Sequence, residues 1–301
     1  MPMKPVKFNL MTSVTAWGFS PFQIGVIIVL ILLAAWYMYG TYLLAMRGRR
    51  WSNWRLVSFL AGLLMIDIAL QSPLATFTMS YFQAHALQHL VLMAAAPPLL
   101  ALGAPSTLLL QTATKPHKTL WLKILHSKPF AAVSHPVTVW FLYYGAMFAF
   151  FLTPAIGFAM EHMALMDLIN VGFLLGATLF WWPIVAVDPI PRWHMDYGAK
   201  LVNLLIGVPI EAFLGITIMM NHNKIASMYS LASTHAGGGI LWSMSEMFSV
   251  LAIIPIFFQW MHSEDRKAVR ADRASDVTVF DPEAEAQAAI VAVIAAPPAS
   301  K

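Results

Sequence analysis

Residues 21–46 read PFQIGVIIVLILLAAWYMYGTYLLAM, an apolar run without a charged side chain. A helix needs about 20 apolar residues to cross the hydrocarbon core of a bilayer, so this run predicts a membrane-spanning helix. It is too long for the core of a signal peptide, and no small-x-small cleavage site follows it. We therefore expect it to be retained as the first span of a membrane protein.

The rest of the chain repeats this pattern. Of its 301 residues, 59% are hydrophobic and 11% are charged, whereas soluble domains carry roughly 25% charged residues. The sequence predicts an all-α membrane protein with a bundle of seven helices over residues 21–262. We expect residues 1–20 to form an outer segment and residues 263–301 a largely disordered cytoplasmic tail. The predicted spans are roughly 21–46, 56–74, 84–111, 134–153, 163–187, 199–221 and 239–261.

Basic residues between the predicted spans indicate the orientation. Fifteen of the 18 Lys and Arg residues fall in the first, third and fifth loops or in the tail, and only Lys4, Lys7 and Lys224 fall on the other side. Because cytoplasmic loops are enriched in Lys and Arg, the N-terminus is predicted outside and the C-terminus in the cytoplasm. No basic, aromatic-interleaved patch indicates nucleic-acid binding, so none is expected.

A pair of histidines opens the third predicted span in the stretch His85-Ala-Leu-Gln88-His89, and Met93 follows one turn later. Positions i, i+4 and i+8 share one helix face, so these side chains predict a stripe of nitrogen and sulfur ligands. Ala96-Pro97-Pro98 comes next. Because proline has no backbone N–H, the carbonyls of Met93 and Ala94 lose their helical partners, and we expect a kink just below the stripe.

Other ionisable residues are expected near the same depth. With the orientation above, His162 and His222 lie at the outer ends of spans, and His235 lies in the last outer loop. Asp67, Asp167 and Glu246 come from three further predicted helices, on the order of 5 to 12 Å below the outer surface. Ionisable groups inside a membrane usually face a bundle interior or a wet cavity. The predicted metal ligands are His85, His89, Met93, His162, Asp67, Glu246, His222 and His235.

The chain contains no cysteine, which excludes disulfides and thiolate metal sites. A soft metal must then be bound by histidine and methionine, a set of ligands that suits Cu(I) on an oxidising outer face. No metalloprotease, nucleophile-elbow or Walker motif is present, so hydrolysis and nucleotide-driven catalysis have no support in the sequence. We expect a non-enzymatic protein.

Structural alternatives stay open for each of these residues. An isolated histidine at a membrane interface, such as His222, is most often simply hydrogen-bonded. The pair at His85 and His89 could form a hydrogen-bonding face, and most of the 19 methionines suit the packing of irregular membrane interiors. Glu211, near the bilayer centre, marks either a proton path or a protonated side chain bonded to a neighbouring helix.

Several stretches carry a resemblance to a known family. The longest runs from Gln83 through the histidine pair to Met93, and on through the prolines to Gly103-Ala-Pro105. In these stretches the chain resembles the CtaG family of cytochrome c oxidase assembly factors, over about residues 56–262. The shorter matching stretches are Ser134-His135-Pro136, Glu161-His162-Met163, Phe180-Trp181-Trp182-Pro183, Asp188-Pro189-Ile190-Pro191-Arg192, and Gly237-Gly238-Gly239-Ile240-Leu241-Trp242 with Glu246.

The resemblance implies a multi-pass protein of the bacterial plasma membrane that helps to mature a haem–copper oxidase by handling copper. Its implied partners are oxidase subunits, periplasmic copper chaperones and the lipid bilayer. Residue-by-residue transfer covers His85, His89, His162 and Glu246. The chain departs from the family pattern at three places, which leaves open a paralogue with a changed site or partner: Gly172, Glu211 and Thr234-His235.

Two other functions stay open on the sequence alone. In a membrane redox protein, two of the outer histidines at positions 85, 89, 162 and 222 would ligate a b-type haem. In a copper transporter, Glu211 and the Met-rich sixth span would line a path inward. The predicted cofactor is therefore copper as Cu(I), with haem b as the alternative.

Overall fold

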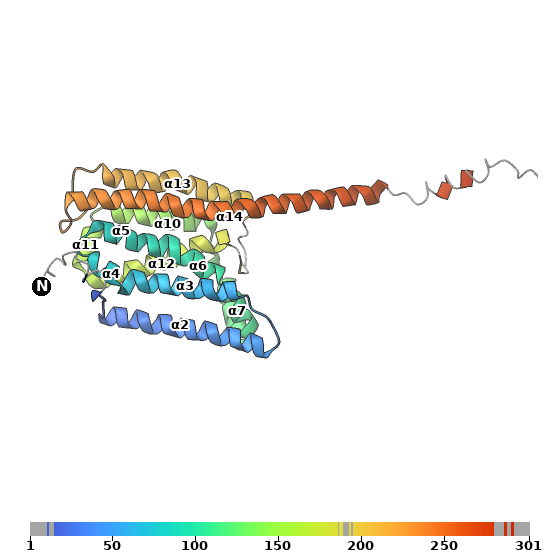
Figure 1. The fold of residues 1–301 in the computed structure, drawn as a ribbon, viewed down its shortest axis with the longest axis horizontal. Helices are drawn as coiled ribbons and strands as arrows, with labels where there is room; N and C mark the ends of the chain where they lie inside the picture. The colour runs from blue at the N-terminus through green and yellow to red at the C-terminus, as the bar shows by residue number, and fades with distance from the viewer. Residues whose placement is uncertain are drawn as a thin grey trace, which may run out of the picture. The chain divides into compact units, whose positions relative to one another are not determined.

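The computed structural model of the protein describes residues 11, 15–185, 187–188, 193, 195–279, 286–287 and 290–291. This part of the chain is helical and contains no β-strand. It divides into two compact units, Met1–Ile253 and Ile254–Lys301. In the first unit, the long helices run alongside one another (Figure 1).

Six helices or runs of helices are long and apolar enough to cross a membrane. Their apolar length is what the sequence predicts, and the first of them ends where expected. They are α2 (Pro21–Met46), α3 (Asn53–Gln71) with α4 (Pro73–Phe77), the run Phe82–Thr112, α12 (Met163–Val185), α13 (Tyr197–Met219) and α14 (Leu231–Val279).

The fourth predicted span is shorter and broken. Helix α10 (Pro136–Phe151) has 16 residues, and α11 (Ala155–Glu161) follows at a bend of 75°. The described residues therefore contain six candidate spans, or seven if this bent pair crosses as one. The predicted count of seven stays a prediction.

The third span contains an irregular turn around Met93, while the kink predicted below that residue stays a prediction. It consists of α5 (Phe82–Leu90), the π-helical turn η1 (Val91–Ala95), α6 (Ala96–Leu102) and α7 (Pro105–Thr112). Pro97 has no N–H to donate to the Met93 carbonyl. That carbonyl instead accepts a hydrogen bond of 2.8 Å from Trp181 Nε1 on α12. The predicted loss of a helical partner at Met93 is thus confirmed, and α12 supplies the replacement.

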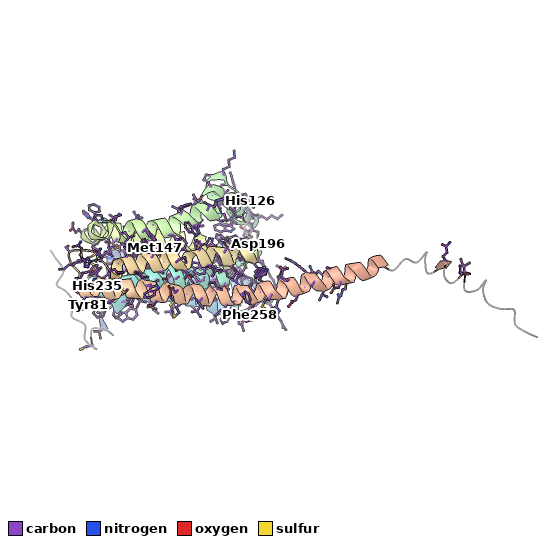
Figure 2. All side chains as sticks on the ribbon, turned by 90° about the horizontal axis from the view of Figure 1, so that it is seen from above. Tyr81, His126, Met147, Asp196, His235 and Phe258 are labelled. Carbon is purple, nitrogen blue, oxygen red and sulfur yellow. The ribbon has the colours of Figure 1, made fainter. Side chains whose placement is uncertain are left out.

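Opposite ends of the first unit carry different side chains. Figure 2 shows Tyr81 and His235 at one end, with His126 and Asp196 at the other. Two short helices, α8 (Lys115–Leu125) and α9 (Lys128–Val133), follow α7 and contain the lysines of the third loop. This grouping agrees with the predicted loop pattern, while the compartment that each end faces stays a prediction.

Asp188 has a structural role in the first unit. Its Oδ2 accepts a hydrogen bond of 2.9 Å from the Ser106 N–H, and its Oδ1 accepts bonds of 2.7 and 2.6 Å from the N–H and hydroxyl of Thr107. Burial raises the pKa of Asp188, although these donors oppose the shift. The carboxyl group thereby caps the N-terminus of α7 from a distant part of the chain.

Helix α14 begins earlier than the sequence predicts. The prediction that His235 lies in a loop is wrong, because α14 already begins at Leu231. The glycine run after His235 marks a close helix contact rather than a loop. A Cβ built on Gly238 would lie 2.6 Å from the Met219 backbone nitrogen and 2.7 Å from the Gly215 carbonyl oxygen.

The end of α14 also differs from the prediction. The helix continues through the charged stretch after residue 262 to Val279, so disorder is wrong for residues 263–279. Lys, Arg, Ala and Glu are good helix formers, and Lys267 pairs with Glu264 one turn before it at 2.8 Å. The charge of this segment is thus compatible with a helix.

Candidate metal site

His85 and His89 come together as their spacing predicts. They lie one turn apart on α5, each side chain is 1% exposed, and their Nε2 atoms are 2.9 Å apart. The rings of Phe150, Phe151 and Phe173 surround His89, with ring centroids 5.3, 5.4 and 5.0 Å from that of the imidazole. The two imidazoles are therefore enclosed by aromatic side chains.

Tyr229, in the loop between α13 and α14, forms a hydrogen bond with His85. Its hydroxyl oxygen lies 2.9 Å from His85 Nδ1 and 2.7 Å from the Thr78 carbonyl oxygen. Burial raises the pKa of Tyr229, so its hydroxyl keeps its proton. A carbonyl oxygen can only accept, so the hydroxyl donates to Thr78 and accepts from His85 Nδ1–H.

These contacts fix the protonation of the pair. With its proton on Nδ1, neutral His85 has a lone pair on Nε2, which accepts from His89 Nε2–H. His89 Nδ1 then carries the remaining lone pair, and it is buried without a hydrogen-bond partner in the part of the chain that the structure describes. An unpaired buried polar atom is costly, and an imidazole lone pair is also a ligand for transition metals.

The substitution Tyr229→Phe tests this chain of hydrogen bonds. Removing the hydroxyl leaves the Thr78 carbonyl and His85 Nδ1–H unpaired, so we expect a loss of about 1 to 3 kcal/mol in the free energy of unfolding. Histidine ¹⁵N NMR should show that His85 no longer keeps a single Nδ1–H tautomer. Tyr39→Phe, at an exposed position on α2, is the matched control. An unchanged His85 spectrum in the Tyr229 variant would contradict the assignment.

The other predicted ligands are not gathered at the pair. Within the described ranges, no three His, Asp or Glu side chains come close enough to hold one metal ion. His162 Nδ1 lies 2.9 Å from a backbone carbonyl of its own turn, and His235 Nε2 lies 2.8 Å from the Asn221 carbonyl. Glu246 accepts a hydrogen bond from Trp242 Nε1. His222 is exposed after α13, and Asp67 is half-buried on α3.

Two methionines lie near the pair. Met93, on the predicted stripe, is 2% exposed in the turn after His89. Met160, which the sequence indicates only as a packing residue, is 4% exposed, and its Sδ lies 2.9 Å from the Tyr229 hydroxyl. Sequence reasoning missed Tyr229 entirely, because no motif includes it. The Glu161-His162-Met163 stretch, directly after Met160 in the sequence, could have indicated that Met160 lies near the site.

A cavity of about 520 Å³ lies between α10 and α12. Phe150 and Phe173, which pack on His89, also line this cavity together with Met93. Gly172 and Gly176 line it too, and a Cβ at either glycine would meet no atom within 4 Å. One layer of aromatic rings therefore separates His89 from an apolar space at the side of the bundle.

Glu211 lies apart from the histidine pair. It is 7% exposed on α13, and its Oε2 lies 3.4 Å from the Ser249 hydroxyl on α14. This contact is the kind expected for a carboxyl group bonded to a neighbouring helix.

Comparison with known proteins adds a family and distant relatives. The family model described as cytochrome c oxidase caa3 assembly factor matches residues 35–263. A protein of Mycobacterium leprae described as uncharacterised is 29% identical over 97% of this chain and 46% of its own length. One of Mycobacterium bovis is 29% identical over 87% of this chain and 42% of its own length. The chain thus spans less than half of these curated relatives, and no solved structure matches it.

Proposed function

Because this chain belongs to the family of cytochrome c oxidase caa3 assembly factors, we propose that it supports oxidase assembly by holding Cu(I) at the His85–His89 pair. The observation that carries this proposal is the buried pair of imidazoles whose Nε2 atoms lie 2.9 Å apart. Neutral imidazoles with thioethers nearby form a set of ligands suited to Cu(I) in a protein without cysteine. The role is delivery of copper, without catalysis.

The hydrogen bonds around the pair support metal binding. His85 and His89 would hold Cu(I) through their Nε2 atoms in place of the N–H···N bond between them, and the displaced proton of His89 would move to its Nδ1. His85 keeps its Nδ1–H bond to Tyr229, the kind of outer contact that orients metal-bound histidines. Met160, which contacts Tyr229, and Met93, one turn after His89, are the candidate thioether ligands.

The same geometry favours copper over a b-type haem. Two axial ligands approach a haem iron from opposite faces of the macrocycle. His85 and His89 instead project from one face of one helix, with their Nε2 atoms 2.9 Å apart. This arrangement suits a single small ion.

We place the pair near the outer side of a bacterial plasma membrane, with the N-terminus outside and the C-terminus in the cytoplasm. The positive-inside rule supports this orientation, since the basic loops lie at the opposite end of the spans. The partners in this proposal are subunits of the haem–copper oxidase, which accept copper, and periplasmic copper chaperones, which supply it.

Deletion of the gene and complementation test the proposal in cells. We expect loss of oxidase activity and of oxidase copper, largely preserved oxidase haem, and recovery of much of the activity when external copper is raised, because mass action offsets a weakened delivery step. His85→Ala with His89→Ala should behave like the deletion, whereas His222→Ala, at an exposed site, should restore activity. Copper delivery would be contradicted if the oxidase of the deletion strain were inactive but contained its full complement of copper. Failure of added copper to restore that activity would contradict it as well.

A further inference from the structure

The turn between α2 and α3 borders a second cavity, which is open and has a volume of about 830 Å³. Gly48 adopts a φ of +68°, which glycine tolerates well, and lets the chain reverse directly after α2. The lining combines Arg49 and Arg50 in the turn with Tyr42 on α2 and Leu56 on α3. The cavity therefore has a cationic part and an apolar part.

Four arginines lie at this turn, and the protein engages two of them. Arg47 donates a hydrogen bond of 3.0 Å to a carbonyl oxygen of α7, and the Arg55 guanidinium lies 5.0 Å from the centre of a tryptophan ring. Among the described residues, the guanidinium groups of Arg49 and Arg50 have no hydrogen bond or ion pair, and no carboxylate lines the cavity. Two unbalanced positive charges indicate an anionic ligand.

The position of the cavity indicates what kind of anion. It lies at the ends of two candidate spans, where lipid headgroups would meet a membrane-spanning helix. Tyr42 and Trp54, both lining residues, are 57% and 67% exposed, and such aromatic residues are enriched at membrane interfaces. The cavity also extends along α2 as far as Thr41, toward the apolar part of that span.

We propose that this cavity binds an anionic phospholipid. Arg49 and Arg50 contact the phosphate, since guanidinium groups match phosphate oxygens in two-point hydrogen bonds. Tyr42 and Leu56 contact the start of the acyl chains. Basic pockets between membrane helices are known to bind the headgroups of anionic lipids. This site is independent of the histidine pair and of copper.

Lipid titration of the purified full chain in detergent tests the proposal. Phosphatidylglycerol binding, followed by native mass spectrometry, should exceed phosphatidylcholine binding. Arg49→Gln with Arg50→Gln should lower phosphatidylglycerol affinity by about tenfold or more. Lys115→Gln with Lys123→Gln removes the same charge from α8, outside the cavity, and should change the affinity by no more than about twofold.

Three results would overturn the proposal. Equal losses in the arginine and lysine variants would show attraction to surface charge instead of a built site. Equal binding of phosphatidylcholine to the unaltered chain would remove the anionic requirement. Displacement of phosphatidylglycerol by millimolar inorganic phosphate would identify the ligand as a free anion. Arg47 and Arg55 remain in the arginine variant, so the packing of the turn is kept.

Discussion

Alanine at both His85 and His89 should lower the affinity of the purified protein for Cu(I) on the order of a hundredfold or more, since removing even the outer contacts of metal ligands typically costs 10- to 100-fold. Both substitutions remove imidazoles that are 1% exposed and bonded to each other. Competition with a colorimetric Cu(I) chelator measures the affinity.

Matched controls separate loss of ligands from loss of folding. His222→Ala with His235→Ala removes two histidines from the same end of the bundle, and the affinity should stay within about twofold. His89→Gln keeps a polar side chain in the buried position and should still weaken binding. Unchanged affinity in a folded double-alanine variant would remove the pair from the copper site.

Alanine at Gly238 should destabilise the fold by about 1 to 3 kcal/mol, the usual cost of overpacking, and lower the midpoint of thermal unfolding. The added methyl group would meet backbone atoms of Met219 and Gly215 at 2.6 and 2.7 Å, and backbone cannot turn aside as a flexible side chain can. Helices α13 and α14 must then separate. The measurement is thermal unfolding of the purified protein in detergent.

Gly172→Ala is the matched control, because it makes the same chemical change where no atom lies within 4 Å. Alanine restricts the unfolded chain and favours a helix, so this variant should be more stable by about 0.4 to 1 kcal/mol. The two glycines should thus respond with opposite signs. Equal responses would contradict the close packing of α13 against α14.

The apolar spans could be predicted from the sequence because length and hydropathy alone define them. The prediction 21–46 coincides with α2, and 163–187 and 199–221 differ from α12 and α13 by no more than two residues at either end. The beginning of α14 could not be predicted in this way. Three consecutive glycines weaken a helix by intrinsic propensity, and only tertiary packing accounts for two of them, since Gly237 approaches Phe82 and Gly238 approaches the backbone of α13.

The candidate site was predictable where its contacts are local. His85 and His89 are one helical turn apart, so their spacing alone brings them together. Tyr229 lies 144 residues from His85 along the chain, in a loop without a motif, so its contact depends on tertiary packing. Asp67 and Glu246 were predicted to join the pair because they lie at a similar depth in the membrane, and they do not. Depth does not determine which way a helix face points.

If His85 and His89 hold copper as proposed, their aromatic enclosure would also limit the rate of copper exchange. An ion held behind Phe150, Phe151 and Phe173 would be out of reach of a small chelator until a ring rotated or the Tyr229 loop moved. Its residence time is then set by the frequency of that opening, as in proteins where a lid limits product release. A partner protein that bound in the cavity between α10 and α12 and moved these rings would speed copper transfer without competing with the histidines for the ion.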